Sequence, residues 1–238
     1  MKLFYAAAAA LCIALGGAAT VSADDISADV LTYNGGTKVA TARGNVVIHA
    51  NEGAEMTGQE GEYHFEDRSA VLSGGVHYQK GESTMTADTV SLGGDKTLTG
   101  NGNVIMYDGQ EKRTIKGDHV IYNPDTGYSK VDGNGFISTP DGSLSAPLIE
   151  GNAKEIRLTA SGGVTFESQA HQLTGSGDQA VYTKSPDADD GKVVLTGHAE
   201  AEQNGNTFQG PELIFTLADN SVKTNGRSTL VITNTAGQ

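Results

Sequence analysis

One short pattern occurs seven times along this chain and limits the folds available to it. Apolar residues and glycines occupy every second position, most clearly in the stretch LTGNGNVIM from Leu98 to Met106. In a β-strand, such alternate side chains point to one face. A glycine in mid-strand weakens the strand and indicates a bulge, a bend or close approach of another backbone. The pattern therefore predicts strands that are distorted near their middle.

The pattern repeats with a period typical of repeat architectures. Each unit can be anchored at the glycine two positions before an apolar residue, and the anchors follow one another at spacings of 30, 28, 33, 27, 35 and 29 residues. Five of the seven units carry Val or Ile two positions after the anchor. The anchors are Gly44, Gly74, Gly102, Gly135, Gly162, Gly197 and Gly226.

Each unit also has a first half, which opens with a small, acidic or proline residue and then alternates. We interpret a unit as a short strand, a turn and a longer strand, so seven units predict about fourteen strands in one continuous all-β array. The recurring acids are placed at strand starts, where turn and edge chemistry explains them. These acids are Asp29, Asp88, Asp118 and Asp178.

The N-terminus has the features of a secretory signal. Lys2 is followed by an Ala-rich apolar run, and Val21-Ser22-Ala23 supplies the small residues that a signal peptidase reads, which predicts cleavage before Asp24. The competing interpretation is a retained membrane anchor, but the run is at the low edge of the length that spans a bilayer. We therefore predict a signal peptide over 1–23 and export to the periplasm.

Charge and cysteine content exclude several kinds of partner. Removing Lys2 changes the formal net charge from −13 to −14 and removes Cys12, which is the single cysteine of the sequence. Nucleic-acid binding needs clusters of Lys and Arg, and this acidic chain has none. Without disulfides, stability must come from the core and from strand pairing.

The alternation gives the strands one apolar and one polar face, as expected where a sheet covers a single interior. The inward positions are slim near the middle of each long strand, and the chain contains no tryptophan and only 6% aromatic residues. Small inward residues leave two possibilities open: close packing of the facing layers, or a hollow that holds something long and apolar.

Catalytic and metal-binding motifs are missing from the sequence. The six histidines form no HExxH, and there is no CxxC, no GxSxG nucleophile elbow and no GGxGxD calcium repeat. The Gly100-Asn101-Gly102 stretch is too short for a phosphate loop and precedes a strand. We expect no enzyme activity, no cofactor and no metal.

Several copies of one short signature resemble a known family. Ala28-Asp29, Ala87-Asp88 and Gly117-Asp118 are each followed downstream by Gly-Asn-Val or Gly-Gly-Val, as at Gly44-Asn45-Val46 and Gly74-Gly75-Val76. This arrangement resembles the OstA-like (LptA-like) family of periplasmic lipopolysaccharide-transport proteins. The resemblance places one domain at 24–238, clearest over 26–137 and looser in the degenerate repeats 146–232.

The resemblance implies a fold, a cargo and partners. The fold is an open, twisted β-jellyroll of two antiparallel sheets, and the cargo is lipopolysaccharide, whose lipid A acyl chains lie in the apolar interior. Implied partners are an inner-membrane-anchored OstA-like protein, an outer-membrane β-barrel translocon and further copies stacked end to end. The residues expected to line the trough are Val46, Ile48, Val76, Tyr78, Val104, Met106, Ile137, Val164 and Phe166.

Two features depart from the family pattern. Seven units are more than a short bridge protein needs, and Pro147 and Pro211 stand where other units have Asp. Proline cannot donate to a strand ladder, so these strands are expected at edges or bulges. Two other functions therefore stay open beside the lipid bridge: a structural or adhesive β-solenoid with a filled core, and a β-helix enzyme acting on polysaccharide.

Overall fold

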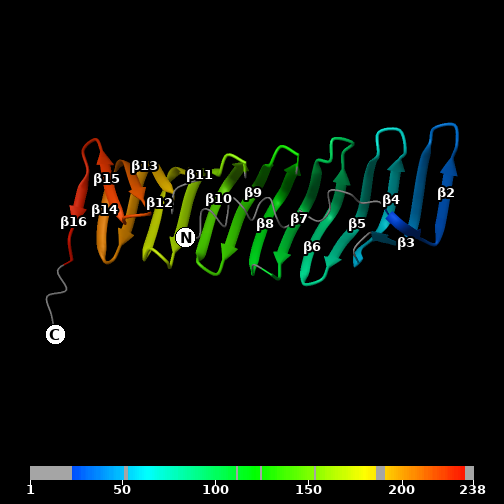
Figure 1. The fold of residues 1–238 in the computed structure, drawn as a ribbon, viewed down its shortest axis with the longest axis horizontal. Coiled ribbons are helices and arrows are strands. Elements are labelled where there is room, and N and C mark those ends of the chain that lie inside the picture. The colour runs from blue at the N-terminus through cyan, green and yellow to red at the C-terminus, as the bar shows by residue number, and fades with distance from the viewer. Residues whose placement is uncertain are drawn as a thin grey trace.

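The computed structural model describes residues 23–50, 53–110, 112–123, 125–152, 154–185 and 191–233. These residues form one long sheet whose strands follow one another in sequence order along the molecule (Figure 1). The predicted signal peptide lies outside the described residues, apart from Ala23. The strands are β1 (Ala23–Ser27), β2 (Val30–Asn34), β3 (Val39–Ala50), β4 (Ala54–His64), β5 (Ser69–Lys80), β6 (Ser83–Leu92), β7 (Leu98–Asp108), β8 (Arg113–Asn123), β9 (Tyr128–Thr139), β10 (Gly142–Asn152), β11 (Arg157–Ser168), β12 (Leu173–Thr183), β13 (Lys192–Gln203), β14 (Asn206–Thr216), β15 (Ser221–Asn225) and β16 (Thr229–Val231).

Every neighbouring pair in the sheet is antiparallel. The first and last positions are each occupied by two short strands, because β1 and β2 both pair with β3, and β15 and β16 both pair with β14. Counted by position, the sheet therefore has fourteen strands, as predicted. No helix in the described part of the chain is long and apolar enough to cross a membrane.

A bulge interrupts nearly every strand pair near its middle. Between β7 and β8 the register shifts from Asn101 to Val104. The two residues inside the shift, Gly102 and Asn103, have φ values of 75° and 48°. Glycine and asparagine tolerate this left-handed backbone better than other residues. The repeated Gly-Asn and Gly-Gly pairs of the sequence are therefore the bulge residues.

The bulges fold each strand back on itself. Phe208 and Phe215 lie seven positions apart on β14, yet their ring centroids are 6.3 Å apart; an extended strand would separate them by roughly 23 Å at about 3.3 Å per residue. On β7, a Cβ at Gly100 would lie 3.2 Å from the Val104 side chain. Each strand thus has two arms that face a common interior. The predicted all-β jellyroll is confirmed, and its two sheets are the two arms of one folded sheet.

The predicted anchor of the fourth unit, Gly135, is wrong by two positions. Gly133 and Asn134 have positive φ values, 71° and 54°, whereas Gly135 pairs with Ala146 in the regular ladder. The error arose because Gly133 is followed two positions later by Gly135, where most other units carry Val or Ile, whereas Gly135 is followed by Ile137. With Gly133 as anchor the spacings become 30, 28, 31, 29, 35 and 29 residues, which is more regular.

The predicted short first strands are also wrong. β6, β8 and β12 have 10, 11 and 11 residues, so they match the strands that follow them. Asp88, Asp118 and Asp178 therefore lie in mid-strand instead of at strand starts. Each faces the bulge glycine of the next strand, where an added Cβ would collide with the carboxylate. The alternation was misread because the acid interrupts an otherwise continuous strand.

Two rows of turns close the folded sheet. We call the turns β2–β3, β4–β5 and so on to β14–β15 the first turn row, and the turns β3–β4 to β13–β14 the second turn row. Because each strand folds at its bulge, the two rows lie at the free ends of the two arms. The space between the rows, through which the interior could open, is here called the seam.

Candidate functional site

The candidate site is the apolar interior between the arms. Of the nine residues predicted to line it, eight are buried and Ile48 is partly exposed. They come from the second arms of β3, β5, β7, β9 and β11, so the structure brings them to one face of one arm. Whether they touch lipid stays a prediction.

The even-numbered strands also contribute buried side chains to this interior, and the list predicted from the sequence omitted them. Met85, Ile115 and Leu144 lie on β6, β8 and β10 and are at most 3% exposed. They pair directly with predicted lining residues, for example Met85 with Met106. The signal was available, because each stands at an alternate position ahead of Ala or Gly in its own strand.

The small inward residues make room for large side chains of the other arm. A Cβ at Gly58 would lie 2.9 Å from Leu72, and one at Gly135 would lie 3.2 Å from Ile149. The slim positions at Gly58 and Gly135 are therefore filled by side chains of the other arm. In this conformation the interior is a packed core over most of its length.

The solvent exposure of the side chains beside the seam varies along the molecule. At the β2 end, the rim side chains of Tyr33 and Phe65 are 61% and 51% exposed, and their rings meet edge to face. In the middle, Leu98 is 7% exposed. Toward the C-terminal end, Leu158 and Tyr182 on the same rim are 1% exposed. The seam is thus open to solvent at β2–β4 and shut at β11–β15.

A buried ion pair lies at the second turn row. Arg113 donates from Nη2 to Asp108 Oδ2 at 2.8 Å, and both side chains are less than one tenth exposed. The pair closes the β7–β8 turn over the core. Loss of one partner of a buried ion pair strongly destabilises a protein, because the other charge is left unpaired away from water. The Asp108–Arg113 pair is therefore a structural element of the rim.

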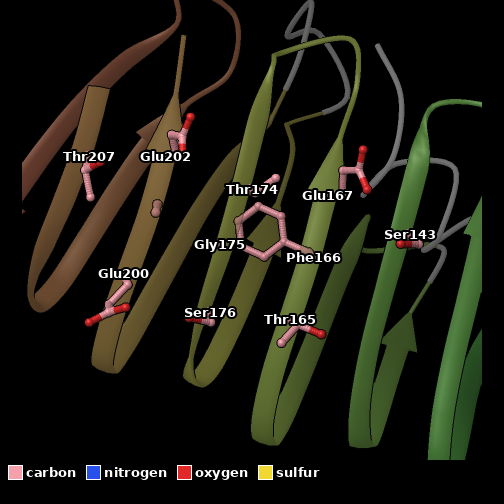
Figure 2. A pocket seen from close by; sticks show the side chains of 11 residues that line it. Ser143, Thr165, Phe166, Glu167, Thr174, Gly175, Ser176, Glu200, Glu202 and Thr207 are labelled. Atoms are coloured by element: carbon pink, nitrogen blue, oxygen red, sulfur yellow. The ribbon is translucent and has the colours of Figure 1, made fainter. Parts of the chain in front are cut away.

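A hollow of about 500 Å³ lies along β10–β14. Figure 2 shows the Phe166 ring between the β11 and β12 ribbons, with Glu167, Glu200 and Glu202 around it. Apart from Phe166, Gly175 and Ala201, the lining is polar or acidic. An acidic hollow suits an anionic lipid poorly, and none of the other predicted lining residues borders it.

Three of the histidines lie at bulges or at the first edge of the sheet. His119 is hydrogen-bonded to Asn101 at 2.5 Å, and His198 lies 3.1 Å from Asp178 at the β12–β13 bulge. His49 joins Asp25 and Glu55. Among the residues that the structure describes, no group of three His, Cys, Asp or Glu side chains is placed to hold a metal ion.

The geometry defines a class of protein: a β-jellyroll made of one sheet folded along its length around an apolar interior, with unpaired strands at both ends. The model of a family described as "LptA/(LptD N-terminal domain) LPS transport protein" matches residues 55–221, more than half of the chain. The chain belongs to this family, and the predicted OstA-like identity is confirmed. The family is one of transport proteins, which agrees with the expectation that the chain is not an enzyme.

One solved structure with similarity to the chain is that of LptH, the LptA-homologous periplasmic component of the lipopolysaccharide transport device of Pseudomonas aeruginosa. The two sequences are 17% identical, and the match covers 53% of this chain and 98% of LptH with a TM-score of 0.45. The chain matches no curated protein.

Proposed function

We propose that this protein carries lipopolysaccharide through the periplasm from the inner to the outer membrane, holding the acyl chains between the two arms of the sheet. The observation that carries the proposal is the continuous apolar interior in a chain of a lipopolysaccharide-transport family. Each acyl CH₂ buried there contributes about 0.8 kcal/mol. The nine predicted lining residues and their partners on the even-numbered strands supply that surface.

The exported location follows from the predicted signal at residues 1–23 and the family. The two membrane partners, an inner-membrane-anchored OstA-like protein and an outer-membrane β-barrel translocon, belong to the same proposal. Each would pair with one end of the sheet, because an unpaired edge strand presents free N–H and C=O groups to a partner strand.

The ends of the sheet also suit a second copy of the chain. The β1–β2 edge runs opposite to β3, and the β15–β16 edge runs opposite to β14, so the last strand of one copy and the first of the next would continue the antiparallel order. At both edges, the strand position is divided into two short strands at the place where the inner strands have their bulge. A second copy of the chain would therefore also continue the row of bulges. Exposed apolar residues lie at the two edges: Val30, Leu31, Leu230, Val231 and Ile232.

Lipid capture tests the proposal. Photoreactive p-benzoylphenylalanine replaces Tyr78, which points inward and is 7% exposed, and a matched variant carries it at the outward neighbour His77. After expression in a host with an outer membrane, light should join lipopolysaccharide to the protein at position 78 and not at 77. Equal capture at the two positions, or none at 78, would reject an interior lipid site.

The packed core favours a second candidate, a structural β-solenoid without ligand. Val131, Ile137, Leu144 and Ile149 are fully buried by other side chains of the chain itself. Denaturing mass spectrometry of the purified exported protein separates the two functions. Lipid A at about one molecule per chain supports transport, and a stable lipid-free protein that ignores added lipopolysaccharide supports the solenoid.

A charged residue introduced at one edge of the sheet tests end-to-end assembly. Ile232→Lys places a cation at the last edge, where the side chain is 65% exposed, and Val71→Lys places one on β5, away from both edges, where the side chain is 43% exposed. Light scattering across a concentration series should show association lost in the first variant only. Assembly that is insensitive to Ile232→Lys would argue against this edge.

A further inference from the structure

A contact joins the two turn rows in the C-terminal part of the seam. His171 lies in the β11–β12 turn of the second row, and Asn220 lies in the β14–β15 turn of the first row. Nδ1 of His171 and Oδ1 of Asn220 are hydrogen-bonded at 3.1 Å, although the residues are 49 positions apart. The bond therefore spans the seam.

This contact differs from the other ties among the turns. Lys38 and Glu66, 3.2 Å apart, join neighbouring turns of the first row, and so do Lys96 and Asp125 at 3.0 Å. Such ties hold one arm together along its length and place no constraint on the distance between the arms. A bond from one row to the other sets that distance.

Both turns that carry the contact are anchored. Asn220 has a φ of 53°, and the preceding Asp219 accepts a hydrogen bond of 3.0 Å from the Ser221 amide. On the other side, Gln172 accepts a bond of 3.2 Å from the Asn204 amide of the next turn in its row. The two side chains are thus presented to one another by ordered turns.

Burial follows the contact. Leu173, next to the His171 turn, is 1% exposed, and Leu217, next to the Asn220 turn, is 4% exposed. At the other end of the seam, Phe65 directly follows β4 as Leu217 directly follows β14, and it is 51% exposed. Leu98, in the middle of the seam, is 7% exposed, so the rim side chains are most fully excluded from water at the end where the two rows are joined.

We propose that the His171–Asn220 contact is a latch, and that acyl chains occupy the interior at β11–β14 only when it opens. The inference rests on the proposed lipid-carrying function. With the latch closed, this part of the interior is filled by its own side chains. With the latch open, the arms separate at the seam and expose the same apolar surface to a lipid chain.

The test locks the latch with a reversible bridge. His171 and Asn220 are both replaced by Cys and joined by a short bifunctional methanethiosulfonate reagent, which dithiothreitol removes. The described residues contain no cysteine, so the bridge has one place to form. p-Benzoylphenylalanine at Phe166 reports lipopolysaccharide in the latched part, and at Tyr78 it reports lipid in the part near the open seam.

We expect the locked protein to capture lipopolysaccharide at position 78 and to lose capture at position 166, with capture at 166 restored by dithiothreitol. The matched control joins Cys at Gln172 and Asn204, which bridges two turns of one row and should leave both signals unchanged. Capture at 166 that persists in the locked protein overturns the latch. Loss of capture at 78 in the unlocked protein instead rejects the lipid-carrying function, and the latch with it.

A second variant tests the latch without a bridge. Asn220→Gly removes the hydrogen-bonding group and suits the left-handed backbone at this position. Loss of one hydrogen bond shifts an opening equilibrium by about threefold to tenfold, so capture at 166 should rise by that factor while capture at 78 stays constant. An unchanged ratio between the two positions would contradict the proposal.

Discussion

Asp118 and Asn134 are joined across the bulge between β8 and β9 by a hydrogen bond of 3.2 Å from the Asn134 amide to the carboxylate. Gly133 lies between them, and its missing side chain leaves the space that the Asp118 carboxylate occupies. The same relationship joins Asp29 to Asn45 at 3.0 Å beside Gly44. The repeated acid and the repeated glycine of the sequence are therefore two halves of one bend.

The bulge between β4 and β5 offers a matched pair of glycine substitutions. Gly74 and Gly75 both have positive φ, 89° and 77°, but a Cβ at Gly74 would collide with Gln59 while one at Gly75 would meet nothing within 4 Å. We expect Gly75→Ala to lower the free energy of unfolding by about 1 kcal/mol, the cost of a left-handed alanine. Gly74→Ala should cost about 1–3 kcal/mol more, because the side chain must also displace Gln59.

Urea unfolding followed by circular dichroism measures both variants. Gly75→Asn is the control, because asparagine occupies this position in other units and tolerates the left-handed region; it should change stability by no more than about 0.5 kcal/mol. Equal losses for the two alanine variants would show that the space beside Gly74 does not matter.

The repeat, the all-β class and the number of strand positions were predictable, because each follows from local alternation and from glycine placement. The position of each bend was less predictable. The pair Gly133-Asn134 and the nearby Gly135 look alike in a single sequence, and only the register with β8 and β10 distinguishes them. The length of the even-numbered strands was hidden because an aspartate in mid-strand resembles a strand start.

The sequence pattern predicted which side chains point inward, but it did not predict how far each of them is shielded from solvent. Ile48 and Ile137 stand in the same alternating pattern, yet Ile137 is fully buried and Ile48 is partly exposed. Ile137 lies on β9 between two full-length strands, whereas Ile48 lies on β3 beside the short strands of the first edge. Local patterns also do not reveal contacts between residues far apart in sequence, such as the hydrogen bond between His171 and Asn220.

Closure of the core predicts different mutational costs along the molecule. Leu195 is fully buried on β13, so Leu195→Ala should lower the free energy of unfolding by about 2–5 kcal/mol, the usual cost of a large cavity. Ile48→Ala, near the open end, removes side-chain atoms that already contact water and should cost clearly less. Comparable losses measured by denaturant unfolding would show that the interior is equally packed at both ends.

The Asp108–Arg113 pair predicts a strong effect of a single charge. Asp108→Ala leaves the Arg113 guanidinium buried without its carboxylate, so the free energy of unfolding should fall by about 3–5 kcal/mol. The matched exposed pair is Lys96 with Asp125, and Asp125→Ala should cost no more than about 1 kcal/mol. Thermal unfolding of the two variants compares them, and similar shifts in Tm would show that burial of the first pair has no energetic consequence.

The first edge of the sheet is predicted to depend on pH. The Asp25 carboxylate, 2.7 Å from His49 Nδ1, raises the pKa of that imidazole above its ordinary value of 6.5, and Glu55 on the other side adds to the effect. Asp25 is on β1 and His49 on β3, so protonated His49 holds the edge strand in place. Because the pKa is raised in the folded state, this stabilisation is complete below pH 6.5 and is lost as pH rises through the folded pKa.

Hydrogen exchange of the β1 amides, corrected for the intrinsic rate at each pH, measures this change. Protection of β1 should fall as pH rises above about 6.5, while protection of β9 in the centre of the sheet stays constant. His49→Gln removes the titrating group and should make the protection of β1 independent of pH in this range. A pH-dependent loss that survives in His49→Gln would assign the change to another group. Added salt should weaken the effect in the wild-type chain, because these charges face solvent.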